Sequence, residues 1–139
     1  MTSKSQPLAL LVDDDPQLRN SIARLLAHAG YRTVCAADLS AARVLLDEAR
    51  PDVLLLDFNL HDEVGTELLE ELASRDDAPP TVVVSASPVA ETIAARFAVE
   101  HLDKPFTLDE VERAITRAQR PTRWVGAEAR AQSFYRDLP

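Results

Sequence analysis

Three short apolar runs stand out along the chain, at positions 8–12, 53–56 and 82–84. None of them alternates with polar residues, which is typical of strands buried on both faces of a parallel sheet. Two weaker strand candidates lie at 31–37 and 100–103, and we expect the second near a sheet edge. The pattern therefore predicts five strands, three of them fully buried.

Segments with helical spacing separate these runs. The first is expected to end at Gly30, because glycine is the usual residue just after the last turn of a helix. The last begins after Thr107, which forms a capping box with Glu110. The apolar positions of these two helices are 18, 22, 25, 26 and 29, and then 111, 114, 115 and 118. Further helices are expected at 41–49, 65–74 and 89–98.

Strands and helices alternate from the first apolar run to residue 119, as (βα) repeated five times. This order predicts an α/β fold, a doubly wound five-stranded parallel sheet with right-handed crossovers and helices on both faces. We expect one domain at 1–119 and a basic, aromatic tail or linker at 120–139. The tail is either a frayed or packed extension or a contact for a partner or a second copy of the chain. Its large aromatic residues are Trp124, Phe134 and Tyr135.

Composition narrows the classes of function. The 139 residues are 46% hydrophobic and 27% charged, as in a folded globular protein, and a net charge of −8 argues against direct contact with nucleic acid. Cys35 is the only cysteine, so the chain has no disulfide framework and suits a reducing compartment. No segment approaches the roughly 18 apolar residues of a membrane span. We therefore expect a cytoplasmic protein that does not bind membranes.

Polar residues follow the predicted strands at the end where open α/β sheets bind ligands. Asp13 and Asp14 follow the first strand and Asp57 the third, while Ser85 and Lys104 follow the fourth and fifth. Two carboxylates about 4 Å apart repel each other by roughly 4 kcal/mol at an effective dielectric constant near 20. A divalent cation would offset this repulsion, and Mg²⁺ suits a site of few carboxylates completed by phosphate oxygens.

Simpler explanations exist for single members of this set. Asp15 precedes Pro16, a favoured first residue of a helix, and is most simply the N-cap of the first helix. Asp57 could be a turn residue, Ser85 alone carries little information, and Lys104 could be a surface residue. The functional hypothesis depends on all of them falling at the correct strand ends.

The segments LLVDDDPQLR, LLLDFNL, VVVSAS and HLDKPF occur in this order, each at the end of its own strand. Together they resemble the receiver domains of two-component response regulators, over about residues 7 to 119. The resemblance implies a flavodoxin-like sheet with strand order 2-1-3-4-5. It also implies that Asp57 is the phosphoacceptor, and that Asp13, Asp14, Asp57 and the backbone carbonyl of Asn59 hold Mg²⁺ or Mn²⁺.

The same resemblance assigns roles around the phosphoryl group. Lys104 would pair with the phosphoryl oxygens, Ser85 would hydrogen-bond one of them, and the Lys104–Pro105 peptide is expected to be cis. The phosphoryl group would come from a sensor histidine kinase or a histidine phosphotransfer protein. The modified domain would then switch contacts with a downstream effector protein, and it would catalyse only its own phosphorylation and dephosphorylation.

The chain departs from the family pattern around the fourth helix and beside the site. His101 stands where an aromatic switch residue is common, and it is either a half-buried edge-strand histidine or such a switch. Phe97 stands where glycine is usual, and the segment between Ser85 and Lys104 is shorter than the commonest spacing by nearly a helical turn, so the fourth helix is expected to be short, irregular or displaced. His61 replaces a common proline beside the site.

Two other classes of function remain open. One is an interaction module of the same fold that no longer uses phosphate, suggested by the altered fourth helix. The other is a haloacid-dehalogenase-like phosphatase, because Asp13 and Asp15 have that family's Asp-x-Asp spacing. Pro16 and Gln17 do not continue the phosphatase pattern.

Overall fold

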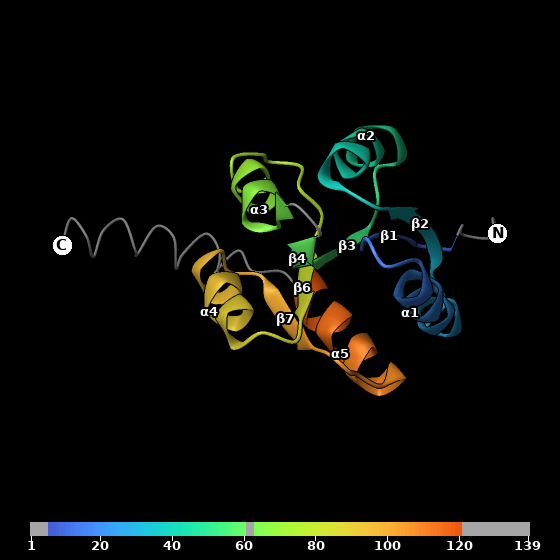
Figure 1. Ribbon diagram of the computed structural model, residues 1–139. Helices are drawn as coiled ribbons and strands as arrows, with labels where there is room; N and C mark the ends of the chain where they lie inside the picture. Colours follow the sequence, from blue (N-terminus) through green and yellow to red (C-terminus); the bar gives the residue numbers. More distant parts are fainter. Residues whose placement is uncertain (1–5, 61–62, 121–139) are drawn as a thin grey trace.

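A computed structural model describes residues 6–60 and 63–120 of the chain. Five parallel strands form one sheet in the order β2-β1-β3-β6-β7, which confirms the predicted 2-1-3-4-5 order of a doubly wound sheet (Figure 1). Each pair of neighbouring strands is parallel. The strands of this sheet are β1 Leu8–Val12, β2 Arg32–Ala36, β3 Val53–Asp57, β6 Thr81–Ser85 and β7 Glu100–Asp103.

Five helices cover the two faces of the sheet. Helices α1 and α5 pack on one face, and α2, α3 and α4 pack on the other (Figure 1). Such two-sided cover is what crossovers of one hand produce in a sheet that is wound outward from its centre. The helices are α1 Pro16–His28, α2 Leu39–Ala49, α3 Thr66–Ala73, α4 Pro88–Arg96 and α5 Leu108–Gln119.

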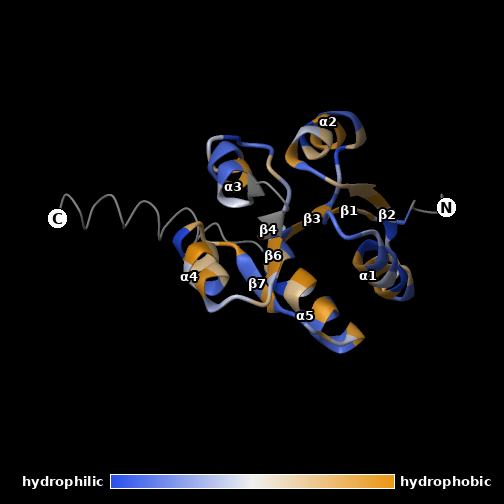
Figure 2. Ribbon diagram, viewed as in Figure 1, coloured by the Kyte–Doolittle hydropathy of each residue, from blue (hydrophilic) through white to orange (hydrophobic). Residues whose placement is uncertain are grey.

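The central strands supply two separate hydrophobic cores. Every residue of β1, β3 and β6 is buried, and Figure 2 shows these strands as the hydrophobic centre of the molecule. Successive side chains point to opposite faces, so Leu10 lies in the core under α2, α3 and α4 while Leu11 lies in the core under α1 and α5. Fully burying one such side chain contributes about 1.5–3 kcal/mol, so the apolar runs stabilise both layers at once.

The predicted helix boundaries are confirmed where they depended on caps. Gly30 has φ +93°, its N–H donates to the Ala27 carbonyl at 3.0 Å, and the Tyr31 N–H donates to the Leu26 carbonyl at 2.9 Å. This paired closure of a helix favours glycine because of the positive φ. At the start of α5, Thr107 and Glu110 form the expected capping box.

One part of the fold was not expected, and the fourth helix is short, as one of the expected alternatives had it. A small antiparallel hairpin follows β3, formed by β4 Asn59–Leu60 and β5 Glu63–Val64, and the sequence pattern did not predict it. The fourth helix is a regular α-helix of nine residues, capped by Ser87, and it ends at Arg96 instead of residue 98. The chain then reverses through Ala98, which has φ 58°.

His61 and residues 121–139 of the tail lie outside the described residues. None of the helices within 6–60 and 63–120 has the length and apolar character needed to cross a bilayer.

We expect Thr107→Ala to lower the free energy of unfolding by about 1 kcal/mol, because alanine cannot accept the hydrogen bond from the Glu110 N–H. Urea denaturation followed by circular dichroism measures the change. Thr116→Ala is the matched control, since Thr116 lies exposed within the same helix and its hydroxyl bonds only a carbonyl of that helix. An equal loss in both variants would contradict the capping role.

Candidate functional site

The carboxyl ends of four parallel strands meet at one edge of the sheet. Asp13 directly follows β1, and its N–H donates to the Ala36 carbonyl at the end of β2 (3.0 Å). Asp57 is the last residue of β3 and pairs in register with Val84. The Lys104 N–H after β7 donates to the Ser85 carbonyl at the end of β6 (3.0 Å). The register therefore brings together the residues that the sequence placed at separate strand ends.

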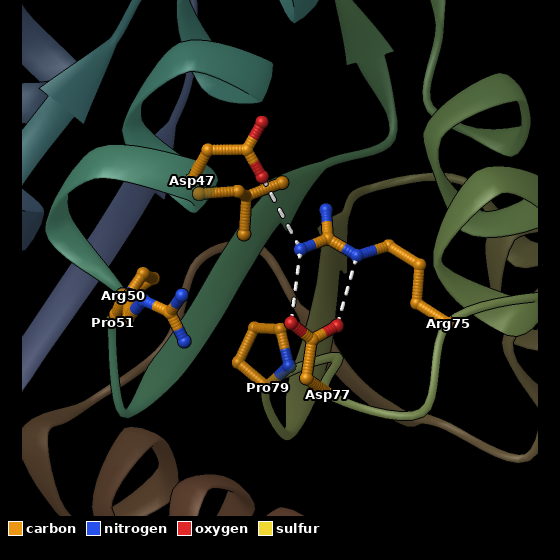
Figure 3. Close-up of a pocket in the computed structure, with 7 residues that line it drawn as sticks. Asp47, Arg50, Pro51, Arg75, Asp77 and Pro79 are labelled. Atoms are coloured by element: carbon orange, nitrogen blue, oxygen red, sulfur yellow. Dashed lines mark hydrogen bonds and ion pairs between the residues drawn. The ribbon is translucent and has the colours of Figure 1, made fainter.

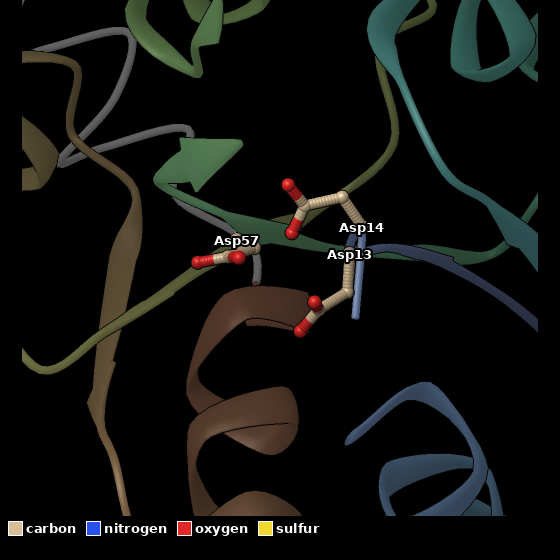
Figure 4. A group of neighbouring side chains, drawn as sticks. All are labelled: Asp13, Asp14 and Asp57. Carbon is tan, nitrogen blue, oxygen red and sulfur yellow. The ribbon is translucent and has the colours of Figure 1, made fainter. Parts of the chain in front are cut away.

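Three carboxylates form the centre of this edge. Asp13, Asp14 and Asp57 each offer an oxygen within 4.8 Å of the others, and Figure 4 shows the three side chains side by side at the ends of β1 and β3. Asp13 is 1% exposed and Asp57 is 6% exposed, while Asp14 is half-buried. Burial lowers the local dielectric constant, so the repulsion between these groups is stronger than it would be on an open surface.

Asp13 has the most constrained carboxylate of the three. Its Oδ1 accepts the Asp15 N–H at 2.9 Å, whereas its Oδ2 is buried and has no hydrogen-bond partner among the described residues. Burial is the main reason why the pKa of Asp13 is raised above its ordinary value of 3.8. The Asp15 N–H and the nearby Lys104 oppose this rise, and Asp14 adds to it.

Lys104 brings the positive charge of the site. Its Nζ lies 3.4 Å from Asp57 Oδ1 and 3.7 Å from Asp13 Oδ2, and its side chain is 22% exposed. The Lys104–Pro105 peptide is cis, as the resemblance predicted. A single ammonium group thus faces two carboxylates, which leaves the cluster with a net negative charge.

Ser85 lies buried beside this cluster at the end of β6. Its Oγ accepts the Ser87 N–H at 2.9 Å, and Ser87 in turn caps α4. His101 lies on the neighbouring strand β7, paired in register with Val83, with a side chain that is 12% exposed. Its Nε2 is 3.5 Å from the Asp103 carboxylate. The switch role of Ser85 and His101 stays a prediction.

The donor set fits a hard divalent cation. All three side-chain ligands are carboxylate oxygens, and one of them, Asp13 Oδ2, is a buried oxygen that a cation would satisfy. The main chain at Asn59, expected to add a carbonyl oxygen, begins β4 two residues after Asp57. Oxygen ligands of this kind and number suit Mg²⁺ or Mn²⁺ better than zinc.

Asp15 and Pro16 have the structural roles that the sequence indicated. The Asp15 side chain accepts the N–H groups of Gln17 (3.0 Å) and Leu18 (3.3 Å) and caps α1, whose first residue is Pro16. Asp15 is exposed, and its carboxylate is used by the helix terminus. The acidic triplet therefore separates into one cap and two carboxylates of the cluster.

Two residues shape the site in ways that the sequence did not reveal. Arg19 donates from Nη1 to the main-chain carbonyl of Asp13 at 2.8 Å. Gly65 packs against the end of β3, where an added Cβ would lie 3.3 Å from the Phe58 carbonyl and 3.4 Å from the Asp57 carbonyl. The sequence contains one indication of the role of Arg19. A cation near the N-terminal end of a helix is disfavoured by the helix dipole, so its presence there indicates a partner.

A pocket of about 220 Å³ lies at the opposite edge of the sheet, before β3 and β6 begin. Figure 3 shows Arg75 between two carboxylates there, with Nη2 3.3 Å from Asp47 and Nε 3.1 Å from Asp77. Opposite charges are already paired in this pocket, and it is remote from the acidic cluster. We therefore assign the chemistry to the cluster.

Comparison with known proteins agrees with this geometry. The response regulator receiver domain family matches residues 9–116. Response regulator MprA of Mycobacterium leprae is 36% identical over 131 residues, covering 90% of this chain and 57% of MprA. Regulatory protein AtoC of Escherichia coli is 30% identical over 112 residues, covering 78% of this chain and 24% of AtoC. The chain thus spans about half the length, or less, of these curated relatives.

A solved structure shows the same fold. Chemotaxis protein CheY4 of Vibrio cholerae superposes with a TM-score of 0.73 at 24% identity, covering 82% of this chain and 99% of CheY4. The family match spans most of the chain and includes β1 from its second residue, together with β3, β6, β7 and the residues that follow these strands. The chain therefore belongs to the response regulator receiver domain family of two-component signalling.

Proposed function

We propose that this receiver domain accepts a phosphoryl group on Asp57 in a reaction that requires Mg²⁺ or Mn²⁺. One observation carries the proposal: three carboxylates and one lysine converge at the ends of the strands, and the buried Asp13 Oδ2 has no hydrogen-bond partner among the described residues. A cation would neutralise the carboxylates, and the phosphoryl oxygens would pair with the Lys104 ammonium group.

Asp13, Asp14 and Asp57, with the Asn59 carbonyl, would hold the cation. Bound there, it would neutralise charge on the phosphoryl oxygens, as metal ions do in phosphoryl transfer generally. Asp13 is suited to a fixed ligand position, because its main chain is tied to β2 and its Oδ1 to the next turn. Half-buried Asp14 lies nearer to solvent, where a coordinated water could accompany it.

Asp57 would act as the nucleophile. A carboxylate oxygen of Asp57 forms a bond to phosphorus while the bond from phosphorus to the donor's imidazole nitrogen breaks, which leaves an acyl phosphate. Lys104, 3.4 Å from Asp57 Oδ1, would pair with the incoming phosphoryl oxygens, and the Ser85 hydroxyl would hydrogen-bond one of them. The site works by positioning and charge compensation, so the domain catalyses only its own modification and its reversal.

Movement of Ser85 toward the phosphoryl group would transmit the change. The Ser85 Oγ accepts the Ser87 N–H. A Ser85 hydroxyl that turned to the phosphoryl oxygens would therefore give up its bond to the residue that caps α4. His101 on the adjacent strand would respond by changing its rotamer. The surface near α4 and β7 would then differ between the two forms, which is how we expect the signal to reach an effector protein.

The phosphoryl donor would be a sensor histidine kinase or a histidine phosphotransfer protein, and the output would be contact with a downstream effector. We place the receiver at 1–119 in the cytoplasm, and we assign 120–139 to a linker or tail that could contact a partner or a second copy. The net charge of −8 supports protein contacts over direct contact with nucleic acid.

The two alternatives have less support. A phosphatase of the haloacid-dehalogenase type would need Asp15 in the site, but the Asp15 carboxylate caps α1. An interaction module that no longer uses phosphate was suggested by the expectation of an altered fourth helix. This support is weak, because α4 is regular and capped. Neither alternative explains the cluster of Asp13, Asp14 and Asp57.

We expect a small phosphodonor such as acetyl phosphate to add one phosphoryl group to the wild-type domain in the presence of Mg²⁺, and Asp57→Ala to abolish the addition. Mass spectrometry of the freshly labelled intact protein measures it. Asp38→Asn is the matched control, because Asp38 only caps α2 and asparagine is an equally good cap. Equal labelling of wild type and Asp57→Ala would refute the assignment of Asp57.

We expect Asp13→Asn to stabilise the Mg²⁺-free domain by about 1 kcal/mol at neutral pH, because it removes a buried charge at a functional site. The pKa of Asp13 is raised on folding, so its ionisation costs stability that is absent below the ordinary pKa of 3.8 and grows as pH rises through the folded pKa. The advantage of asparagine should therefore disappear in acid. Thermal unfolding of the wild type and Asp13→Asn at several pH values measures this difference in stability.

Mg²⁺ provides the second half of this test. A saturating concentration, about 100 times the dissociation constant, should stabilise the wild type by about 2.7 kcal/mol and Asp13→Asn far less. Asp38→Asn should respond as the wild type does. An equal Mg²⁺ response in Asp13→Asn and wild type would show that Asp13 is not a ligand.

A further inference from the structure

Arg19 makes a contact that the phosphoryl transfer proposed above does not itself require. It lies in the fourth position of α1, half-buried, and its Nη1 reaches back to the main-chain carbonyl of Asp13 at 2.8 Å. The two residues are six positions apart, so the contact spans the turn that joins β1 to α1. Arg19 thus connects the first helix to the strand end that carries two of the three carboxylates.

The bonded carbonyl belongs to the peptide that joins Asp13 to Asp14. A peptide group is planar and includes the Cα atoms of both residues, so fixing the direction of its carbonyl restricts the orientation of both side chains. The pairing of β1 with β2 and β3 ends at Val12, one residue earlier. The Arg19 guanidinium therefore continues, for one more residue, the support that the sheet gives to β1.

Asp13 is held on every other side as well. Its N–H is bonded to the Ala36 carbonyl on β2 and its Oδ1 to the Asp15 N–H, which leaves Oδ2 directed to the cluster. If the carbonyl bond were lost, the peptide between Asp13 and Asp14 could rotate. The two carboxylates that flank this peptide would then turn with it.

We propose that Arg19 is a positioning residue for the cation and phosphoryl site: its guanidinium holds the Asp13–Asp14 peptide so that both carboxylates face Asp57. The inference rests on the proposed function, because it concerns the affinity of that site for its cation. Hydrogen bonds that orient the ligands of a metal commonly change metal affinity by 10- to 100-fold when they are removed.

Electrostatics and positioning predict opposite results for Arg19→Met. The substitution removes a positive charge close to the acidic cluster, which by Coulomb's law alone would tighten the binding of Mg²⁺. Loss of the carbonyl bond would loosen the two ligands and weaken binding. The sign of the change in the dissociation constant therefore identifies the role of Arg19, and a merely structural role would change stability without changing this constant.

The experiment titrates Mg²⁺ into the wild-type chain of 139 residues and its variants by isothermal titration calorimetry. We expect Arg19→Met to bind Mg²⁺ about tenfold more weakly than the wild type. Arg19→Lys keeps the charge, but its single ammonium group is a less directional donor than the guanidinium fork, so we expect it to bind more weakly too. Acetyl phosphate labelling of Arg19→Met should be slow at low Mg²⁺ and recover as Mg²⁺ approaches saturation.

Arg43→Met is the matched control. Arg43 is also half-buried on a helix, α2, but its guanidinium bonds Glu67 and Glu71 of α3 and not the main chain of the cluster. The Mg²⁺ affinity of the Arg43→Met protein should equal that of the wild type. If Arg19→Met does not fold, as judged by circular dichroism, Arg19→Lys carries the test.

Each result decides between the hypotheses. Weaker Mg²⁺ binding by the Arg19 variants, with Arg43→Met unchanged, supports the positioning role. Equal or tighter binding by the Arg19 variants, while the wild type binds Mg²⁺ and takes the phosphoryl label, overturns this inference and leaves the proposed function standing. A wild type that neither binds Mg²⁺ nor takes the label overturns both.

Discussion

Repulsion among three carboxylates at the end of a buried sheet is the constraint on which the rest of this site depends. The parallel register holds Asp13 and Asp57 where water cannot screen them, and Lys104 compensates only part of their charge. The two cores below the site provide the rigidity that keeps these groups together. A site of this kind holds unfavourable charge, which a bound cation would offset.

The interactions around the cluster show how a fold can hold like charges close together. The main chain does most of this work: Asp13 is bonded through its N–H, its carbonyl and its Oδ1, and Gly65 allows the following helix to pack directly on the carbonyls of Asp57 and Phe58. These bonds use the N–H, the carbonyl and Oδ1 of Asp13, whereas Oδ2 has no hydrogen-bond partner among the described residues. The order of the backbone therefore decides which oxygen of Asp13 faces the cluster.

Much of the fold could be predicted from sequence, because its signals are local and strong. Unbroken apolar runs identified the central strands, and Gly30 and the Thr107 capping box marked helix ends. The hairpin of β4 and β5 was missed because two-residue strands are too short to show a period. The second helix begins at Leu39, two residues before its predicted start, since its cap is the side chain of Asp38.

The site was predictable to a similar degree and for a different reason. Parallel strands bring their carboxyl ends to one edge, so the order of the strands was enough to bring Asp13, Asp57 and Lys104 together. The bond from Arg19 to a main-chain carbonyl could not be foreseen, because it depends on where a long side chain folds back over a turn. The steric role of Gly65 likewise depends on a close approach between two segments that only the packed structure contains.

The alternation of β1 between two cores limits how this segment can evolve. Leu10 belongs to one core and Leu11 to the other, and the aspartates follow in the same pleat. Inserting or deleting one residue within the strand would send each later side chain to the opposite face, exchanging the two cores and turning the carboxylates away from Asp57. Single substitutions of apolar residues in β1 preserve this alternation, whereas a change of length within the strand does not.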